Sequence, residues 1–437
     1  MQPKENQTGD AVLDSTESVC PECLKVVGAK IVTRDNAVYM EKTCPEHGRF
    51  TTYLWPDVKH YLWMKSSRFP YARPEQPVAS IKGCPQDCGL CTSHLRQPTL
   101  VEIELTQSCN LRCPVCFMAA EDAAVTDANE PGLPALETMF KKILAKTGPQ
   151  ISIQLTGGEP TVRADLPDIV RLGRKIGFMA IEVNTNGVLI ARNQDYAGKL
   201  ADAGVSGIYL QFDGLTRTVY EKIRGRDLLD VKLKAVENCR LAGVQVVLAM
   251  TVIAGVNEDQ MGDVLRFALD NRDVIAGIAY QPAFGSGRFD LSAERRLTMG
   301  DVAFLLAEQS GDLLDPYDLW PLGCSHSLCD SATYIVEKEG KFEPLTRSLS
   351  FEDYHTHFNP DSPQGSVFPD IAASMFPDLE PGLSIIVMNF MDCMSMDLKR
   401  LRECSMTVAG PDGRIIPFCG YQLTDISGKK SGENRPG

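Results

Sequence analysis

Three closely spaced cysteines carry the most distinctive chemistry in the sequence. Cys109, Cys113 and Cys116 follow a C-x3-C-x2-C pattern in ELTQSCNLRCPVCFM, directly after the apolar run 100–105. Three thiolates on one tight loop can hold three irons of a [4Fe–4S] cube and leave the fourth iron open to a ligand. A structural zinc half-site is the alternative, although such sites normally combine two C-x2-C knuckles. The pattern therefore favours an iron–sulfur cluster with one open position.

Polar motifs follow the next apolar runs of the chain. The string TGGEP contains Gly157, Gly158 and Glu159, and the string NTNG contains Asn184, Thr185 and Asn186. Paired glycines let the backbone approach a ligand, and a glutamate can accept hydrogen bonds from an ammonium group. The side-chain amides of NTNG suit hydroxyls or a carboxylate. Asp213 in QFDG is either a site carboxylate or a helix N-cap, and the cap is the favoured interpretation.

The order of these motifs after Cys116 resembles the radical S-adenosylmethionine (radical SAM) superfamily. The resemblance implies that Cys109, Cys113 and Cys116 hold a [4Fe–4S] cluster that binds SAM, with TGGEP along the methionine part of SAM. The string TVIAGVNED resembles the adenine-contacting region, which assigns Val252 and Val256 to SAM. It also implies an external electron donor such as ferredoxin or flavodoxin. One departure is Val115, where the family usually has an aromatic residue; here the aromatic residue is Phe117.

Further strings point to one branch of that superfamily. FMD, PDG and IPFC near the C-terminus, with CPEHG and GCPQDCGLC upstream, resemble tetraether lipid synthases and methanopterin-precursor methylases. This resemblance implies reductive cleavage of SAM and hydrogen abstraction, leading to carbon–carbon bond formation or methylation of a lipid or pterin-like small molecule. One alternative is a radical SAM maturase that modifies peptides. Another is an electron carrier or metal-binding protein without turnover, which would not need TGGEP or NTNG.

The N-terminal cysteines predict a separate metal site. Cys20 with Cys23 and Cys44 with His47 form two knuckles, joined by a hairpin-like run at 30–42. This layout is typical of a zinc ribbon and of a rubredoxin-like iron site, and the spacing fits both metals.

The remaining cysteines predict one or two auxiliary [4Fe–4S] clusters. Cys84, Cys88 and Cys91 repeat the C-x3-C-x2-C spacing among glycines and prolines, with His94 as a possible fourth ligand. A second set provides the four thiolates that a protein-held cube requires: Cys324, Cys329, Cys404 and Cys419. Cys239 is interpreted as a packing residue. Cys393 is interpreted as a spare thiol near the substrate or as packing.

Apolar runs alternate with amphipathic segments between residues 99 and 300, a pattern that predicts parallel βα units. The expected strands are Val101–Leu105, Ile151–Leu155, Ala180–Asn184, Gly207–Phe212, Val244–Val252 and Gly277–Gln281. The expected helices include Leu166–Ile176, Tyr196–Ala203, Leu229–Ala242 and Asp259–Leu269. The fold class is thus α/β, a partial (β/α)6 barrel with an N-terminal cysteine-rich metal-binding module and a C-terminal auxiliary-cluster extension. The expected divisions are a disordered tail at 1–19, the module at 20–98, the barrel at 99–300, the extension at 301–425 and a disordered tail at 426–437.

Composition limits the possible partners. The chain has 437 residues, 43% of them hydrophobic and 23% charged, which is ordinary for a globular protein. A net charge of −13 argues against general affinity for nucleic acid or anionic membranes. No apolar run is long enough for a membrane span, and MQPKENQTGD lacks the core of a signal peptide. We therefore expect a cytoplasmic protein with a small-molecule substrate, whose 15 cysteines are reduced and bind metal.

Overall fold

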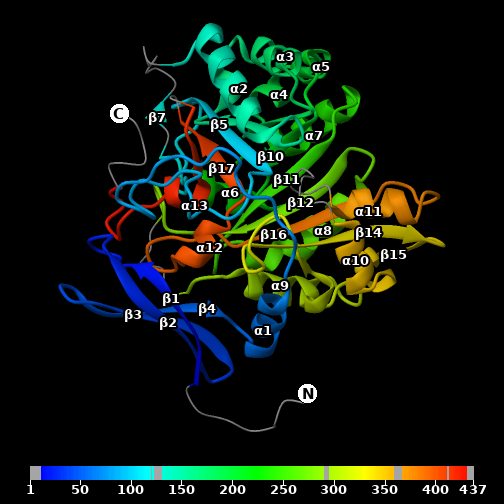
Figure 1. Cartoon of the computed structure of the whole chain (residues 1–437). Helices are drawn as coiled ribbons and strands as arrows, with labels where there is room; N and C mark the ends of the chain where they lie inside the picture. Colours follow the sequence, from blue (N-terminus) through cyan, green and yellow to red (C-terminus); the bar gives the residue numbers. More distant parts are fainter. Residues whose placement is uncertain are drawn as a thin grey trace.

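The computed structural model describes residues 11–119, 121–122, 130–289, 295–358, 367–410 and 413–430. The N-terminal part is an antiparallel sheet in the order β1-β2-β3-β4, followed by one helix (Figure 1). The elements are β1 (Ala11–Val19), β2 (Val26–Arg34), β3 (Ala37–Cys44), β4 (Gly48–Trp55) and α1 (Val58–Ser66). The expectation of disorder is wrong for residues 11–19, because β1 pairs along β2. Residues 1–10 lie outside the described residues.

The predicted parallel sheet is present, and each strand begins and ends within two residues of its expected bounds. The six strands are β5 (Leu100–Thr106), β8 (Ser152–Gly157), β9 (Ala180–Thr185), β10 (Gly207–Gln211), β11 (Val246–Val252) and β12 (Ile275–Pro282). Each pairs in parallel with the next one in this order. Buried aliphatic side chains from both the strands and the helices form one continuous core. The α/β partial barrel is therefore confirmed.

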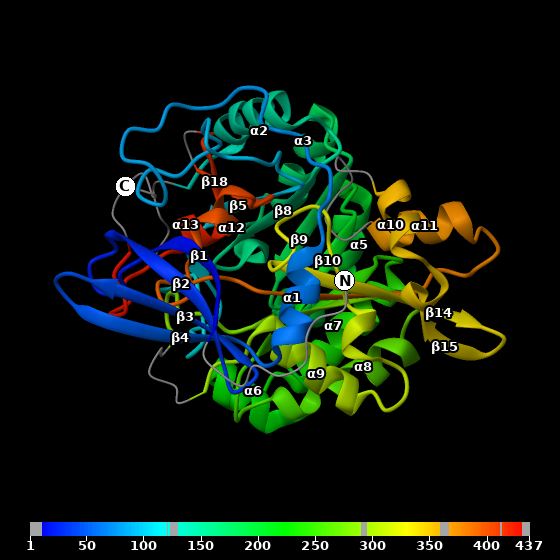
Figure 2. The ribbon, with the colours of Figure 1, turned by 60° about the horizontal axis from the view of Figure 1, so that its bottom comes forward.

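Helices connect these strands and lie outside the curved sheet (Figure 2). They are α2 (Leu133–Thr147), α3 (Leu166–Ile176), α4 (Val188–Arg192), α5 (Gln194–Ala203), α6 (Arg217–Arg224), α7 (Leu229–Leu241) and α8 (Met261–Asp270), with the 3-10 turns η1 (Pro160–Val162) and η2 (Glu258–Gln260). Gly177 and Gly204 end α3 and α5 with φ of 123° and 93°. Glycine is preferred there because other residues are strained at positive φ.

The C-terminal region continues this sheet instead of leaving it at residue 300. The strand β16 (Leu383–Met388) pairs in parallel with β12, and β17 (Met406–Ala409) pairs in parallel with β5. Before them, α9 (Met299–Gln309) packs against the N-terminal module, since a Cβ on Gly300 would lie 2.7 Å from the Trp55 ring. The expected boundary between the barrel and an extension is therefore wrong, because strands from both sides of residue 300 share one sheet.

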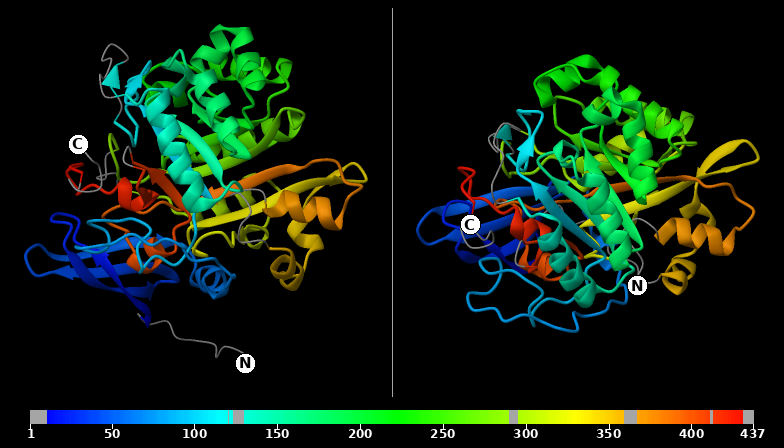
Figure 3. Two further views of the ribbon diagram at one scale, coloured as in Figure 1. Left: turned by 45° about the horizontal axis from the view of Figure 1, so that its top comes forward. Right: turned by 90° about the horizontal axis from the view of Figure 1, so that it is seen from above.

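The other C-terminal elements lie on two sides of the parallel strands. One group surrounds a separate apolar cluster on the side opposite the N-terminal sheet (Figure 3). It comprises η3 (Pro316–Asp318), β13 (Trp320–Pro321), β14 (Asp330–Lys338), β15 (Lys341–Pro344), η4 (Leu345–Ser348), α10 (Phe351–His357) and α11 (Val367–Met375). The other group lies between the N-terminal sheet and the barrel (Figure 1). It comprises α12 (Leu398–Arg402), β18 (Ile415–Pro417) and α13 (Phe418–Tyr421).

The end of the chain returns to the N-terminal module. The Ile426 N–H donates to the Pro21 carbonyl at 2.8 Å, and residues 425–428 form a turn. The expected disorder is therefore wrong for residues 426–430, and residues 431–437 lie outside the described part of the chain. None of the helices described is both long and apolar enough to cross a membrane.

Candidate active site

The three central cysteines lie on the loop after β5, at the carboxyl ends of the parallel strands, where ligands of such sheets bind. Cys109 ends the short strand β6 (Ser108–Cys109), which pairs with β7 (Glu121–Asp122). Cys109 is buried, whereas Cys113 and Cys116 are half-buried. All three line one cavity of about 550 Å³. Small-molecule sites typically have roughly 300–1,000 Å³, so the cavity can hold a cofactor with a substrate.

The two glycines of TGGEP hold the cysteine loop by direct backbone contact. A Cβ on Gly157 would lie 2.3 Å from the Thr106 carbonyl oxygen, and one on Gly158 would lie 2.2 Å from that of Ser108. The Gly158 N–H donates to the Thr106 carbonyl at 2.8 Å. Both glycines also line the cavity. Because they have no side chain, these glycines let the cysteine loop pack against the TGGEP backbone, and they also leave room for a ligand in the cavity.

Glu159 connects TGGEP to NTNG. Its Oε1 atom accepts from Thr161 N–H at 3.1 Å and from the hydroxyls of Thr161 and Thr185 at 2.6 and 2.7 Å. Its Oε2 atom accepts from Asn186 N–H at 2.7 Å. A carboxylate offers about four acceptor positions, so protein donors fill most of them. The main contribution of Glu159 is therefore to fix two loops.

The predicted residues of NTNG all line the cavity, but they differ in how many partners they have. Asn186 donates from Nδ2 to Asn110 Oδ1 at 2.7 Å and thereby supports the cysteine loop. Asn184 donates to Gln154 Oε1 at 3.1 Å, while its own Oδ1 atom is buried without a hydrogen bond. Buried polar atoms usually have a partner, and Asn184 Oδ1 can accept a hydrogen bond from a donor group in the cavity.

A buried ion pair beside the cysteines was not identified from the sequence. Arg224 donates from Nε and Nη2 to the two oxygens of Asp213 at 2.7 Å each, and from Nη1 to the Val115 carbonyl at 3.0 Å. Asp213 is fully buried, and Thr216 occupies the N-cap position of α6, so the N-cap interpretation of Asp213 is wrong. Arg224 follows Cys116 by more than a hundred residues, and no local motif marks it.

A segment after β12 also holds the cysteine loop and was missed. Cys116 and Arg288 exchange backbone hydrogen bonds of 3.2 and 2.8 Å, and Arg288 Nε donates to the Cys113 carbonyl at 2.9 Å. A Cβ on Gly287 would lie 2.4 Å from the Cys116 carbonyl oxygen. Asp392 of the FMD string accepts from Gly285 N–H at 2.8 Å. The glycines of GSGR were the available sequence signal, since close backbone approach requires them.

The structure does not place Val252 and Val256 on the cavity wall. Successive side chains of a strand face opposite sides of the sheet. On β11, Val247, Ala249 and Thr251 line the cavity, whereas Val252 is buried in the core on the helix side. Val256 is half-buried in the following turn and is not a lining residue. The cavity wall thus offers the side chains of Val247, Ala249 and Thr251, and backbone contacts from Val252 and Val256 stay a prediction.

The chemistry of this donor set fits an iron–sulfur cluster. Burial raises the pKa of Cys109 to about 12 and also raises the pKa of Cys113, while Arg224 opposes the shift at Cys113. Such thiols stay protonated unless a metal ion displaces the proton. Three sulfurs facing one cavity, with a guanidinium group beside them, suit a cube held by three thiolates. The unpaired Asn184 oxygen and the two glycines suit a ligand in the same cavity.

Cys84, Cys88 and Cys91 lie together near the C-terminal segment. A hydrogen bond with Cys84, burial, and the charges of Cys91 and Cys404 together raise the pKa of Cys88. A Cβ on Gly420 would lie 3.2 Å from Cys88 Sγ. His94 bonds the backbone from its ring: its Nε2–H donates to the Cys404 carbonyl at 3.0 Å, and the ring also bonds the Arg96 backbone. Cys404, whose charge acts on Cys88, is a further candidate for the fourth ligand.

Three of the four downstream cysteines interact with one another. Burial raises the pKa of Cys404, and the neighbouring Cys419 and Cys329 add to this shift. Arg400 donates to Cys329 Sγ from Nε and Nη2 at 3.4 Å. Cys324 instead packs in the apolar cluster around Trp320 and Tyr354. The structure thus brings together Cys329, Cys404 and Cys419, and Cys404 lies next to both auxiliary groups.

The two cysteines interpreted as packing residues are buried. Cys239 lies in the barrel core on α7. Cys393 is fully buried, and its carbonyl accepts from Lys42 Nζ of the N-terminal sheet at 2.7 Å. It is not among the cavity-lining residues, so the alternative of a thiol near the substrate is not supported.

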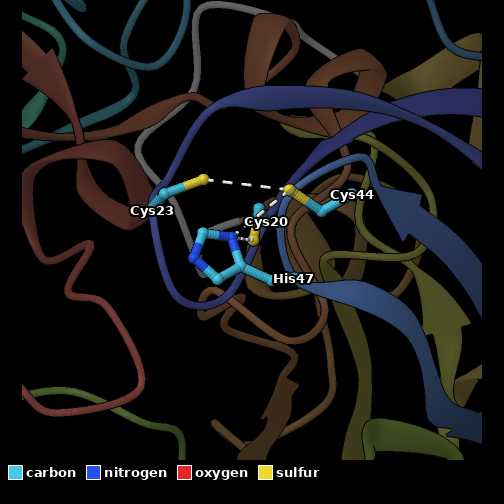
Figure 4. A group of neighbouring side chains, drawn as sticks. All are labelled: Cys20, Cys23, Cys44 and His47. Carbon is cyan, nitrogen blue, oxygen red and sulfur yellow. Dashed lines mark hydrogen bonds between the residues drawn. The ribbon is translucent and has the colours of Figure 1, made fainter.

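The N-terminal knuckles form a compact candidate metal site. The ligand atoms of Cys20, Cys23, Cys44 and His47 all lie within 4.8 Å of one another. Figure 4 shows the four side chains converging, with His47 Nδ1 3.5 Å from Cys20 Sγ and 3.4 Å from Cys44 Sγ. Three sulfurs and one imidazole nitrogen match a closed tetrahedral site for one metal ion.

The chain is similar to several known proteins. Residues 103–268 match the radical SAM superfamily, and residues 12–56 match the HMPTM N-terminal zinc ribbon domain. The chain is 33% identical to the 7,8-dihydro-6-hydroxymethylpterin dimethyltransferase of Methanocaldococcus jannaschii, over 93% of this chain and 92% of that protein. It is 33% identical to the probable GTP 3′,8-cyclase of Aeropyrum pernix over 45% of this chain and 54% of that protein. The crystal structure of Streptococcus suis SuiB aligns with 51% of this chain and 50% of that chain, at a TM-score of 0.39 and 15% identity.

Proposed function

The chain belongs to the radical SAM enzymes, in the family of the 7,8-dihydro-6-hydroxymethylpterin dimethyltransferase, and from this we propose that it methylates a reduced pterin. The observation that carries the proposal is the match to that transferase over nearly the whole of both chains. A multi-cluster carrier without turnover does not fit a transferase family. The pterin transferase is favoured over a peptide maturase because the match to the transferase spans nearly the whole of both chains.

We assign the cofactors to the residues that line or support the cavity. Cys109, Cys113 and Cys116 would hold the [4Fe–4S] cluster, and Gly157, Gly158, Thr185 and Asn186 would bind SAM, which leaves the unpaired oxygen of Asn184 for the substrate. Together, a reduced cluster and SAM supply a 5′-deoxyadenosyl radical, which takes hydrogen from an unactivated carbon. Arg224 and Arg288 fix the backbone of the cysteine loop from two sides.

The metal sites outside the cavity belong to the proposal as well. Cys20, Cys23, Cys44 and His47 would bind one zinc or iron ion. Cys84, Cys88 and Cys91, and the group of Cys329, Cys404 and Cys419, would hold one or two auxiliary clusters that carry electrons. A ferredoxin or flavodoxin would serve as the electron donor. A cytoplasmic location would keep these thiols reduced.

The test measures whether a pterin controls SAM cleavage. The reconstituted protein is incubated without oxygen with SAM and dithionite, with or without 7,8-dihydro-6-hydroxymethylpterin, and 5′-deoxyadenosine is quantified. We expect the pterin to increase 5′-deoxyadenosine, and Cys113→Ala to abolish its formation. The matched control is Cys239→Ala, which removes a thiol far from the cavity and should remain active. Cleavage that does not respond to the pterin would contradict the proposed substrate.

A further inference from the structure

Polar side chains form a floor deep in the barrel, below the cysteine loop. Glu102 on β5, Gln154 on β8 and Glu182 on β9 are register partners. Tyr209 on β10 is the register partner of Asn184 on β9. All five line the cavity. The interior of a small barrel is normally filled by apolar side chains, because unpaired polar groups are costly there. This floor, defined as these five residues, therefore calls for a functional explanation.

The floor contains one hydrogen-bonded chain that leaves an acceptor free. Asn184 Nδ2 donates to Gln154 Oε1 at 3.1 Å, and Gln154 Nε2 donates to Glu182 Oε2 at 2.8 Å. Both ends of the Gln154 amide are thus occupied by its neighbours. The Asn184 Oδ1 atom has no partner among the described residues.

Glu102 is the least satisfied group of the floor. Its side chain is only 4% exposed, and no described residue donates a hydrogen bond to it. Burial raises its pKa to about 8, and the nearby Glu104 adds to the shift. Its neighbours on the adjacent strands are the apolar Val408 and Gln154, whose amide bonds Asn184 and Glu182. The Glu102 carboxyl group thus faces the cavity without a donor from the described residues, so a ligand in the cavity can supply one.

Tyr209 supplies the complementary donor. Its hydroxyl oxygen accepts from Gln281 Nε2 at 2.9 Å, so its own O–H remains available to donate. Burial and the charges of Glu182 and Glu102 raise the pKa of Tyr209, so the phenol keeps its proton. The floor therefore presents two acceptors, Glu102 and Asn184, and one donor, Tyr209.

The rest of the cavity suits a flat ring. Phe117, Phe284, Phe390 and Phe418 line the wall, and the ring centroids of Phe284 and Phe390 are 5.1 Å apart. Glu102 lies four residues before the end of β5, about 13 Å along the strand from the cysteine loop at 3.3 Å per residue. A bicyclic ring standing on the floor would thus extend toward the cysteines.

We propose that Glu102, Asn184 and Tyr209 bind the 2-amino-4-oxopyrimidine edge of the substrate ring. Glu102 accepts from the ring N–H and the 2-amino group, which are adjacent donors that match two carboxylate oxygens. Asn184 Oδ1 accepts the second amino hydrogen, and Tyr209 donates to the 4-oxo group. The assignment of a pterin to this edge rests on the proposed function, whereas the same edge occurs in guanine nucleotides.

The experiment measures binding, without turnover, to the reconstituted protein with SAM and no reductant. The ligands are 7,8-dihydro-6-hydroxymethylpterin, its analogue with an oxo group in place of the 2-amino group, and GTP. We expect Glu102→Gln to weaken pterin binding by about ten- to hundredfold, because a charged acceptor of two hydrogen bonds is lost. The same substitution should change binding of the 2-oxo analogue much less. Glu308→Gln, on the exposed face of α9, is the matched control and should bind all ligands like the wild type.

The outcomes separate this inference from the proposed function. Equal weakening of the pterin and its 2-oxo analogue by Glu102→Gln would overturn the inference, because Glu102 would then act through the structure alone. Binding of GTP with the same dependence on Glu102, and no binding of the pterin, would support the edge assignment and contradict the proposed function. If Glu102→Gln does not fold, Tyr209→Phe tests the same edge. It should weaken binding of the pterin, and unchanged binding would overturn the inference.

Discussion

Glu102 makes substrate binding depend on pH. Its pKa of about 8 in the free cavity falls when two N–H donors bind its carboxylate, so the complex holds fewer protons than the free protein. Affinity for the pterin should therefore rise from pH 6 to pH 8 and level off above pH 8. The ionisable groups near Glu102 are Glu104, Glu182 and Tyr209. Isothermal titration at several pH values should show this rise in the wild type and a flat profile in Glu102→Gln.

The Arg224 and Asp213 pair should be strongly coupled. Arg224→Met leaves a fully buried Asp213 without its cation, which costs about 3–5 kcal/mol in comparable buried pairs. Adding Asp213→Asn removes the unpaired charge and should recover most of the urea midpoint. Arg217→Met, which breaks an exposed ion pair on the same helix, should change the midpoint little. Independent, additive effects of the two buried substitutions would contradict this coupling.

At the scale of elements, the glycine pair of TGGEP joins two strand ends. Gly158→Ala places a methyl group 2.2 Å from the Ser108 carbonyl oxygen, so the cysteine loop must move. We expect this variant to lose iron and thermal stability together. Gly198→Ala is the matched control, because a Cβ at this position on α5 meets no atom within 4 Å. Alanine there should raise stability by about 0.5–1 kcal/mol. Normal iron content in Gly158→Ala would refute the proposed role of the contact.

The elements also show what the sequence could predict. Local patterns of apolar residues predicted the six strands and the main helices. The order of the motifs predicted that the carboxyl ends of the strands meet at one cavity. The pairing of β16 with β12 and of β17 with β5 is non-local and has no local signal. Glu102 and Glu182 were missed because alternating polar residues normally mark the exposed face of a strand. In these strands the polar residues face the barrel cavity, so the alternation marks the cavity wall and not a solvent-exposed face.

At the scale of the whole molecule, the N-terminal module packs against the barrel and shares its hydrophobic core. Trp55 and Tyr61 pack in the same core as the barrel strands, and Lys42 Nζ bonds the carbonyls of Cys393 and Met394 at 2.7 and 3.0 Å. A test of its metal site therefore needs the full chain. The end of the chain adds a further contact through Ile426 and Pro21.

In the full chain, the double substitution Cys20→Ser with Cys44→Ser should remove one metal ion and leave the acid-labile sulfide unchanged. Sulfide belongs to the clusters, whereas the ribbon site holds a single ion between protein ligands. The thermal midpoint should fall, because the metal orders the sheet that packs on the barrel. Metal analysis by mass spectrometry with a sulfide assay provides the measurement, and Cys239→Ala provides the control. A fall in sulfide would assign these cysteines to a cluster instead.

The central claim is that this molecule uses SAM to methylate a pterin in the barrel cavity. The most direct measurement is the mass of the pterin recovered after anaerobic incubation with the reconstituted protein, SAM and a reductant. Deuterium in the methyl group of SAM shows whether that group is the source of the added carbon. The account predicts a pterin that has gained one or two methyl groups, and no gain with Cys113→Ala. An unchanged pterin in a reaction that forms 5′-deoxyadenosine would contradict it.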